Sequence, residues 1–233
     1  MLTQTVEQYL KAIHRLLEVQ GRVGTTSLAQ TLGVKPASVT NMLQRLARTS
    51  PPLLEYERHR GVTFTAAGRK VALRAIRHHR LLESYLHQLL GYSWDRVHEE
   101  ADRMDHVIST EFGDKLAALM KDPRFDPHGD PIPTRTLEFP ECDLEALGDL
   151  QVGQVGVLRR VRDDDPALLR YLGEAGLVPG ARLTVVRKEP FEGPITVRVG
   201  RGAKGPEQSV GVRIARVLQV ERQDGPARQR RAG

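Results

Sequence analysis

The fold of this chain is decided by residues 28–47, which read LAQTLGVKPASVTNMLQRLA. Gly33 follows a short helical run, at the position where helices commonly end in glycine, and Pro36 suits the first turn of a second helix. Val39 and Leu43 then recur at helical spacing and give this second helix an apolar face. Two helices joined by a few residues around a glycine form the helix-turn-helix pattern.

The segments on either side predict a further helix and a β-hairpin. Apolar residues recur at helical spacing from Val6 to Leu17, which predicts an amphipathic helix ahead of the pair. After the pair, the runs 53–56 and 62–64 flank a basic turn and are typical of a hairpin. We therefore expect residues 1–73 to form a winged helix-turn-helix domain.

The rest of the chain predicts a helical part and a β part. Two long helices are expected, from Thr65 to about Leu90 and from Ser93 to about Met120, with a proline-rich linker or clasp to Pro140. Short alternating runs separated by glycine- and proline-bearing turns follow, and they predict a small β-barrel. The expected fold class is mainly α with small β parts. Its divisions are the winged helix (1–73), a helical domain (74–140) and the barrel (147–222).

Composition excludes several classes of protein. The chain has 233 residues, with 39% apolar and 27% charged, which is typical of an ordinary globular protein of more than one domain. We find neither an apolar run of the ~20 residues that a membrane span needs nor a signal peptide, so we expect a cytoplasmic protein with no membrane partner. The single cysteine, Cys142, excludes an internal disulfide and a thiolate metal cluster.

Charge alternates along the chain. Residues 1–75 carry 11 basic and 4 acidic side chains, residues 76–145 carry 8 and 15, and residues 146–233 carry 16 and 10. A basic first part favours nucleic acid as the partner, because neutralising phosphates releases counterions. The acidic, histidine-bearing middle part favours divalent cations.

Candidate DNA contacts lie on the predicted second helix of the helix-turn-helix and in the hairpin turn. Polar side chains suited to reading bases are Ser38, Thr40, Asn41 and Gln44. Side chains suited to phosphates are Lys35, Arg45, Arg48, Arg58 and Arg60.

Histidines and carboxylates in the helical part form a candidate metal constellation. On one helix, His98, Asp102, Asp105 and His106 fall within a stripe of about 100° of an ideal helix surface. The preceding helix supplies His79 and Glu83, one turn apart. If the two helices pack antiparallel, these six side chains converge into a set that suits Mn²⁺, Fe²⁺, Co²⁺, Ni²⁺ or Zn²⁺. A solvated face of ordinary ion pairs is the alternative, and the spacing alone leaves both open.

Taken in order along the chain, these motifs resemble the diphtheria toxin repressor family of metal-dependent transcriptional regulators, including its manganese-responsive branch. The resemblance is carried by the winged helix, by HRLLE (79–83), VHEEAD (97–102) and DH (105–106), by PHGDPIP (127–133), and by VPG (178–180). It implies that residues 74–140 bind metal and dimerise, and that residues 147–222 form an SH3-like domain of the FeoA type.

The resemblance also implies two metal sites per chain. The ancillary site maps to His79, Glu83 and His98, and the primary site maps to Asp102, Asp105, His106 and the first-helix residue Gln8. Relatives carry Met or Asp at the position of Gln8, and the manganese-responsive branch carries an acid at the position of Lys11. Oxygen donors in place of thiolate favour Mn²⁺ and/or Fe²⁺ as the cofactor.

We therefore predict a metal-dependent DNA-binding regulator rather than an enzyme, and expect a repressor of metal homeostasis genes. A shared cation is expected to fix the DNA-binding domain against the dimerisation helices, so that a homodimer fits palindromic double-stranded operator DNA. The alternatives are a winged-helix regulator that answers to an organic ligand, a metallohydrolase, and a scaffold that recruits a protein through its barrel.

Overall fold

The computed structural model describes residues 3–18, 21–57, 59–202 and 204–223. The chain forms two compact units, and it passes between them several times. The first unit consists of Met1–Leu86, Glu99–Arg124 and Ile132–Pro140, and the second of His87–His98, Phe125–Pro131 and Glu141–Gly233. The basic tail at 227–231 lies outside the described residues. No helix among the described residues is long and apolar enough to cross a membrane.

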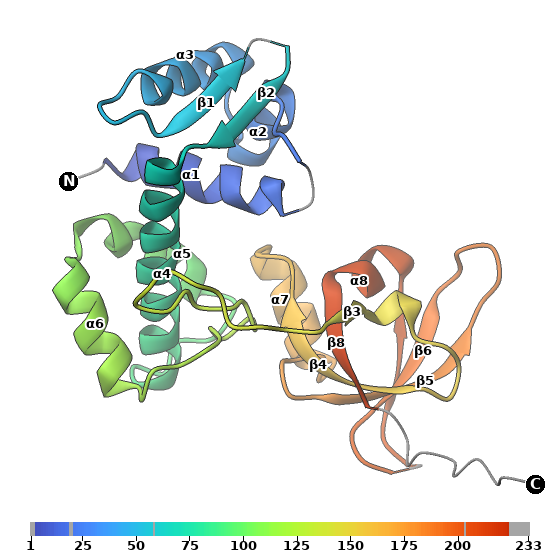
Figure 1. Cartoon of the computed structure of the whole chain (residues 1–233). Coiled ribbons are helices and arrows are strands. Elements are labelled where there is room, and N and C mark those ends of the chain that lie inside the picture. The colour runs from blue at the N-terminus through green and yellow to red at the C-terminus, as the bar shows by residue number, and fades with distance from the viewer. Residues whose placement is uncertain (1–2, 19–20, 58, 203, 224–233) are drawn as a thin grey trace, which may run out of the picture. The chain divides into compact units, whose positions relative to one another are not determined.

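The first unit begins with the predicted winged helix-turn-helix, which is confirmed (Figure 1). Its elements are α1 (Gln4–Leu17), α2 (Thr25–Leu32), α3 (Pro36–Ala47), β1 (Leu54–Glu57) and β2 (Gly61–Phe64). The two strands pair antiparallel, and the three helices and the hairpin enclose one apolar core. The core includes Leu10, Ile13, Leu28 and Leu43, all fully buried.

Two glycines determine how this domain closes. Gly33 ends α2 in the left-handed conformation, with φ of 64°, which glycine adopts without steric cost. Gly61 opens β2 at φ 89°, and a Cβ there would lie 2.6 Å from the backbone oxygen of Val23. The strand can approach Val23 this closely only because residue 61 has no side chain. This approach lets the hairpin pair with the segment ahead of α2.

Four helical elements continue the first unit. They are α4 (Ala66–Gln88), α5 (Val97–Met104), the 3₁₀ turn η1 (Asp105–Val107) and α6 (Thr110–Leu119). The predicted single helix from Ser93 to Met120 is therefore wrong. The backbone becomes extended at Ile108, and the Ser109 side chain accepts a hydrogen bond from the Phe112 backbone N–H, which caps a new helix. Leu81 of α4 packs with Ala117 and Ile132 in a smaller apolar cluster.

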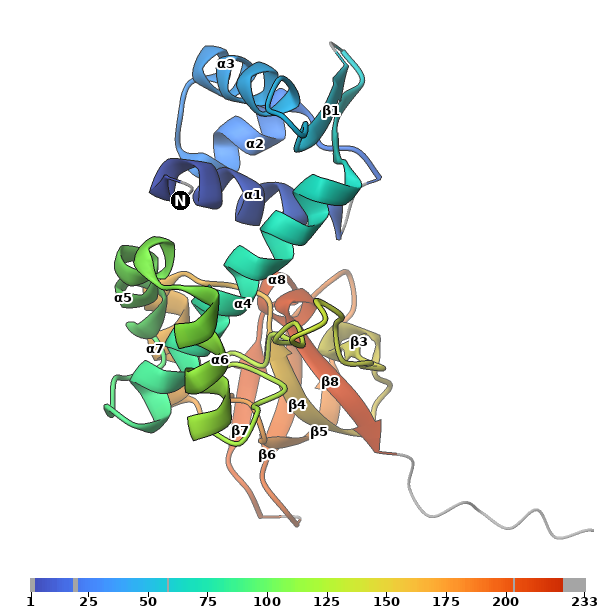
Figure 2. The same ribbon diagram turned by 60° about the vertical axis from the view of Figure 1, so that its left-hand side comes forward.

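The second unit is built on a six-stranded antiparallel sheet of order β3-β8-β4-β5-β6-β7, which can be followed in Figure 2. Its elements are β3 (Glu145–Ala146), η2 (Leu147–Asp149), β4 (Val155–Val161), α7 (Pro166–Glu174), β5 (Arg182–Lys188), β6 (Ile195–Val199), β7 (Glu207–Val210), α8 (Val212–Val217) and β8 (Leu218–Gln223). The predicted small β domain is confirmed. Sequence reasoning missed β3, β7 and α8, because they are short and β7 reads EQSV, with one apolar residue.

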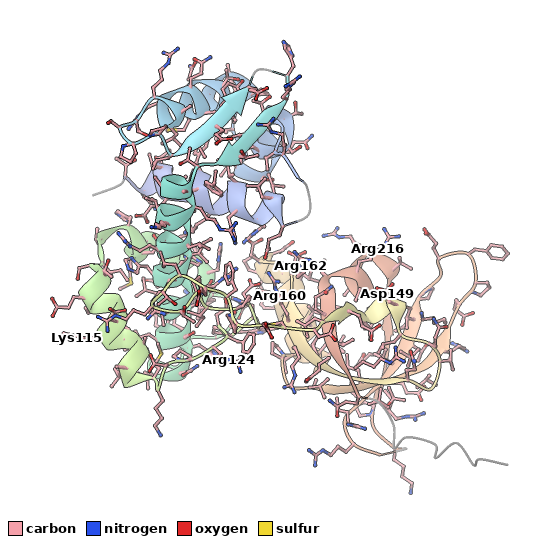
Figure 3. The ribbon with its side chains drawn as sticks, in the orientation of Figure 1. Lys115, Arg124, Asp149, Arg160, Arg162 and Arg216 are labelled. Atoms are coloured by element: carbon pink, nitrogen blue, oxygen red, sulfur yellow. The ribbon has the colours of Figure 1, made fainter. Side chains whose placement is uncertain are left out.

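The proline-rich segment 125–131 is held on this sheet. The Val161 backbone N–H donates to the carbonyl of His128 at 2.8 Å. Gly129 has φ 85°, and a Cβ there would lie 1.7 Å from the backbone oxygen of Arg159. Asp130 pairs with Arg160 of β4, whose place on the sheet Figure 3 labels. The segment is therefore fixed in the second unit by backbone contacts that only glycine at 129 permits.

Candidate metal centre and nucleic-acid interface

A cluster of ligand-type side chains lies inside the first unit. His79 of α4, Asp102 of α5 and Asp105 of η1 each offer one ligand atom, and these three atoms lie within 4.8 Å of one another. His79 and Asp105 are buried, and Asp102 is about a quarter exposed. The three helical elements therefore bring together two of the predicted primary-site residues and one predicted ancillary residue.

Both ring nitrogens of His79 face carboxylates. Nδ1 lies 2.9 Å from Oδ2 of Asp105, and Nε2 lies 3.0 Å from Oε1 of Glu83, one turn further along α4. Burial acts to lower the pKa of His79, but the charge of Glu83 and the hydrogen bonds that Asp105 and Glu83 accept from the ring outweigh it and raise that pKa. The carboxylates therefore orient the imidazole and favour its protonated form.

Lys11 of α1 reaches into the same cluster. Its Nζ donates to Oδ1 of Asp102 at 2.6 Å and to Oδ2 of Asp105 at 2.5 Å, and it lies 3.1 Å from Nδ1 of His79. Burial acts to lower the pKa of Lys11, but the charges of Asp105 and Asp102 outweigh it, so the pKa is raised. Conversely, burial acts to raise the pKa of Asp105, and the hydrogen bond from His79 and the Lys11 charge lower it overall.

Sequence reasoning missed Glu7, which lies one turn before Lys11 on α1. Burial, together with the nearby charge of Asp105, raises the pKa of Glu7 to about 7. Its Oε2 is buried and has no hydrogen-bond partner among the described residues. The i, i+4 spacing of Glu7 and Lys11 was the available signal, because it places both side chains on one face of the helix.

The remaining predicted ligands are Gln8, His106 and His98. Gln8 is half-buried on α1. His106 is half-buried in η1, and among the described residues it belongs to no group of three ligand atoms that lie together. The ideal helical spacing does not extend to His106, because α5 ends at Met104. His98 belongs to the second unit, where its Nε2 lies 3.5 Å from Oδ2 of Asp164.

A buried carboxylate and imidazole in the second unit were also missed. Oδ1 of Asp126 accepts hydrogen bonds from the backbone N–H groups of His128 and Asp130, at 2.8 and 2.9 Å. The His128 ring nitrogen Nε2 lies 2.7 Å from the carbonyl oxygen of Trp94. In the sequence, residues 127–133 served only to support the family resemblance. The run Asp126-Pro127-His128 was the available signal of a carboxylate and an imidazole close together.

The predicted DNA contacts lie on and around α3. Lys35 precedes the helix, and it is exposed together with Ser38, Asn41, Gln44, Arg45 and Arg48. Thr40 is half-buried, and its hydroxyl donates to the carbonyl of Pro36. Arg60 is exposed at the tip of the hairpin and bonds to Glu57. Arg58 lies outside the described residues.

A cavity of about 500 Å³ is lined by residues of α2, α3 and the hairpin. Its walls include Thr26, Thr40, Gln44, Tyr56 and His59. These are hydroxyl, amide, phenol and imidazole groups that donate and accept hydrogen bonds. The exposed polar face of α3 therefore continues into a polar recess beside the hairpin.

The fold and the cluster define a class of protein. A winged helix whose α3 presents polar and basic side chains to solvent is a DNA-binding domain. Here this domain is joined to helices that bury carboxylates and an imidazole in a candidate metal centre.

Comparison with known families agrees with this class. Residues 1–62 match the family described as "Iron dependent repressor, N-terminal DNA binding domain", and residues 65–134 match "Iron dependent repressor, metal binding and dimerisation domain". Residues 146–222 match the FeoA domain. The chain belongs to the diphtheria toxin repressor family of metal-dependent transcriptional regulators, and its relatives are repressors rather than enzymes.

Some relatives are named for iron or for manganese. The iron-dependent repressor IdeR of Mycobacterium tuberculosis (strain ATCC 25618 / H37Rv) is 32% identical over 197 residues, which cover 79% of this chain and 84% of IdeR. The regulator MntR of Geobacillus kaustophilus is 33% identical over 151 residues, 65% of this chain and 95% of MntR. A solved manganese-dependent transcriptional repressor in complex with manganese is 34% identical. It superimposes with a TM-score of 0.85 over 94% of this chain and all of its own.

Proposed function

We propose that this chain is a transcriptional repressor that binds operator DNA when Mn²⁺ and/or Fe²⁺ occupies the cluster around His79, Asp102 and Asp105. The observation that carries the proposal is the convergence of three ligand atoms within 4.8 Å inside the unit that also holds the winged helix. Relatives named for iron and for manganese support the choice of metal.

The donor atoms fit a first-row divalent cation. Carboxylate oxygen and imidazole nitrogen suit Mn²⁺ and Fe²⁺, and the sole cysteine, Cys142, is exposed, outside this cluster. His79, Asp102 and Asp105 would hold the ion, with Glu83 orienting the imidazole from its far side. A bound cation would supply positive charge that holds these acidic side chains together. By resemblance, Gln8, His98 and His106 remain predicted ligands, and the family pattern has room for a second ion per chain.

The winged helix supplies the DNA contact. We propose that Ser38, Thr40, Asn41 and Gln44 read bases, and that Lys35, Arg45, Arg48, Arg58 and Arg60 bind phosphates. In a two-fold homodimer the two α3 helices would enter successive major grooves about 34 Å apart, which requires a palindromic operator. The protein would then act in the cytoplasm.

The three-domain division completes the proposal. Residues 1–73 would bind DNA, 74–140 would bind metal and dimerise, and 147–222 would form the SH3-like domain. The family matches at 1–62, 65–134 and 146–222 support this division. If bound metal strengthens DNA binding, bound DNA must strengthen metal binding by the same factor, with a coupling of typically ~1–3 kcal/mol.

Selection of DNA in the presence of metal tests the function. Purified full-length protein is used to select duplexes from a random pool with Mn²⁺ present, and the selected duplex is then titrated by fluorescence anisotropy with Mn²⁺ and with chelator. We expect a palindromic consensus and binding at least about fivefold weaker in chelator. Equal affinity in both conditions would exclude the metal switch and leave DNA binding intact.

A matched pair of variants then locates the switch. Asp105→Ala removes a cluster carboxylate, whereas Glu111→Ala removes an exposed one from α6 of the same unit. We expect only Asp105→Ala to lose the response to Mn²⁺. A calorimetric titration without any divalent binding by the wild-type protein would instead favour the regulator that answers to an organic ligand.

A further inference from the structure

We propose that the Lys11 ammonium group is a built-in competitor of the metal: it occupies the cation position of the His79–Asp102–Asp105 cluster, and a metal ion must displace it to bind there. This inference rests on the proposed function for its biological meaning, because it concerns how the same site is regulated. The Lys11 ammonium group would raise the free metal concentration that is needed to fill the cluster.

The geometry places the ammonium among the metal's own donor atoms. Lys11 Nζ lies 2.6 Å from Oδ1 of Asp102 and 2.5 Å from Oδ2 of Asp105, and 3.1 Å from Nδ1 of His79. Asp105 and His79 are buried, so these contacts are little screened by water. Lys11 therefore contacts all three groups of the cluster.

A divalent ion and this ammonium cannot share the cluster in this arrangement. First-row divalent ions sit about 2.1 Å from carboxylate oxygen and imidazole nitrogen. An ion at that distance from both carboxylate oxygens would lie within roughly 4 Å of Nζ, which is itself 2.6 and 2.5 Å from the same two oxygens, and two positive charges that close repel strongly. Metal binding at these atoms therefore requires the Lys11 side chain to leave.

Because Lys11 is covalently part of α1, its ammonium group is always present to compete with a metal ion. Lys11 is fixed on α1, so its ammonium competes at an effective concentration set by the chain rather than by the cell. In this structure the same group joins α1 of the winged helix to Asp102 and Asp105. The Gln4 side chain also donates to the backbone oxygen of Asp102 at 3.0 Å, so α1 is held beside α5 at two points.

Two leucine variants test the competition directly. Lys11→Leu removes the ammonium and adds no ligand atom, and Lys115→Leu is the matched control on α6, where Figure 3 labels Lys115 and its side chain is 74% exposed. Free Mn²⁺ is measured by electron paramagnetic resonance while metal-free full-length protein is titrated. We expect Lys11→Leu to bind Mn²⁺ at least about tenfold more tightly than wild type, and Lys115→Leu to match wild type.

A second measurement uses the wild-type protein and so does not depend on the variant folding. Lysines are labelled with an amine-reactive acetate ester, with and without saturating Mn²⁺, and the labelled peptides are quantified by mass spectrometry. We expect Lys11 to be protected in the metal-free protein and its labelling, relative to Lys115, to rise severalfold with Mn²⁺.

The outcomes separate this inference from the proposed function. Unchanged or weaker Mn²⁺ binding by folded Lys11→Leu, or Lys11 labelling that does not respond to Mn²⁺, would overturn the competition. Tighter binding by Lys11→Leu supports it whether or not Mn²⁺ alters DNA affinity, because no DNA is present in either assay.

Discussion

Two helices of the winged helix, α3 and α1, use positive charge in opposite ways. Lys35, Arg45 and Arg48 lie exposed along α3, whereas Lys11 of α1 is 16% exposed and donates to two carboxylates. Both groups belong to one unit and to one basic stretch of sequence. Their difference shows that the environment, rather than the residue type, decides whether a cation is available to a partner.

The physical reason is the cost of desolvating a charge. An exposed arginine keeps its water and can exchange it for a phosphate when DNA arrives. A buried ammonium has already lost its water, so it is tolerated only when it is paired. Lys11 therefore neutralises the protein's own acids, and the cations of α3 remain accessible to solvent.

The largest expected effect comes from breaking the buried side of this comparison. Asp105→Ala removes a buried partner of both Lys11 and His79. We expect the free energy of unfolding of the metal-free protein to fall by about 2–4 kcal/mol, because a buried cation loses a partner. Urea unfolding measures this loss, and Glu111→Ala on the exposed face of α6 is the control. A loss below about 0.5 kcal/mol would show that the cluster contributes no net stability.

Base reading on α3 is expected to show the next largest effect. Asn41→Ala and Gln44→Ala shorten exposed amide side chains on the recognition helix. We expect each to reduce the preference for the selected operator over a scrambled duplex by about 1–3 kcal/mol. Competition anisotropy measures this preference. A uniform loss on both duplexes would instead assign the side chain to phosphate contact.

An exposed cation of α3 is expected to act on affinity alone. Arg48→Ala removes one predicted phosphate contact at the end of the helix. We expect weaker binding to every sequence, a salt dependence whose slope falls by roughly one, and unfolding free energy within about 0.5 kcal/mol of wild type. Affinities at several salt concentrations check this. An unchanged slope would place Arg48 away from the DNA.

The smallest expected effect is on stability, and it concerns the ion pair between Asp95 and Arg170 in the second unit. Burial acts to raise the pKa of Asp95, but hydrogen bonds from Ser93 and Arg170 outweigh it and lower that pKa. A lowered carboxyl pKa stabilises the fold above the ordinary value, and this contribution is lost as the pH falls through the lowered pKa. We expect Arg170→Ala to cost at most about 0.5 kcal/mol at pH 7, because Arg170 is exposed, and less at an acidic pH that protonates Asp95. Urea unfolding at both pH values measures the difference.

Much of the fold could be predicted because its signals are local. The turn at Gly33, the apolar stripe of α3 and the hairpin around Gly61 each follow from neighbouring residues. The end of α5 at Met104 could not be predicted from periodicity, because apolar spacing continues past it. What stops the helix is the Ser109 cap and the extended backbone at Ile108.

The candidate site divides in the same way. The sequence by itself supplied the residue types, the i, i+4 pair His79 and Glu83, and the family. Only the tertiary structure decided that Lys11 and Glu7 of α1 face Asp105, nearly a hundred residues later in the chain. A helical repeat defines which side chains share a face, but the helix that packs against that face is chosen by the core of the whole unit. Tertiary packing therefore decides that Lys11 occupies the cluster, and no local sequence pattern contains that information.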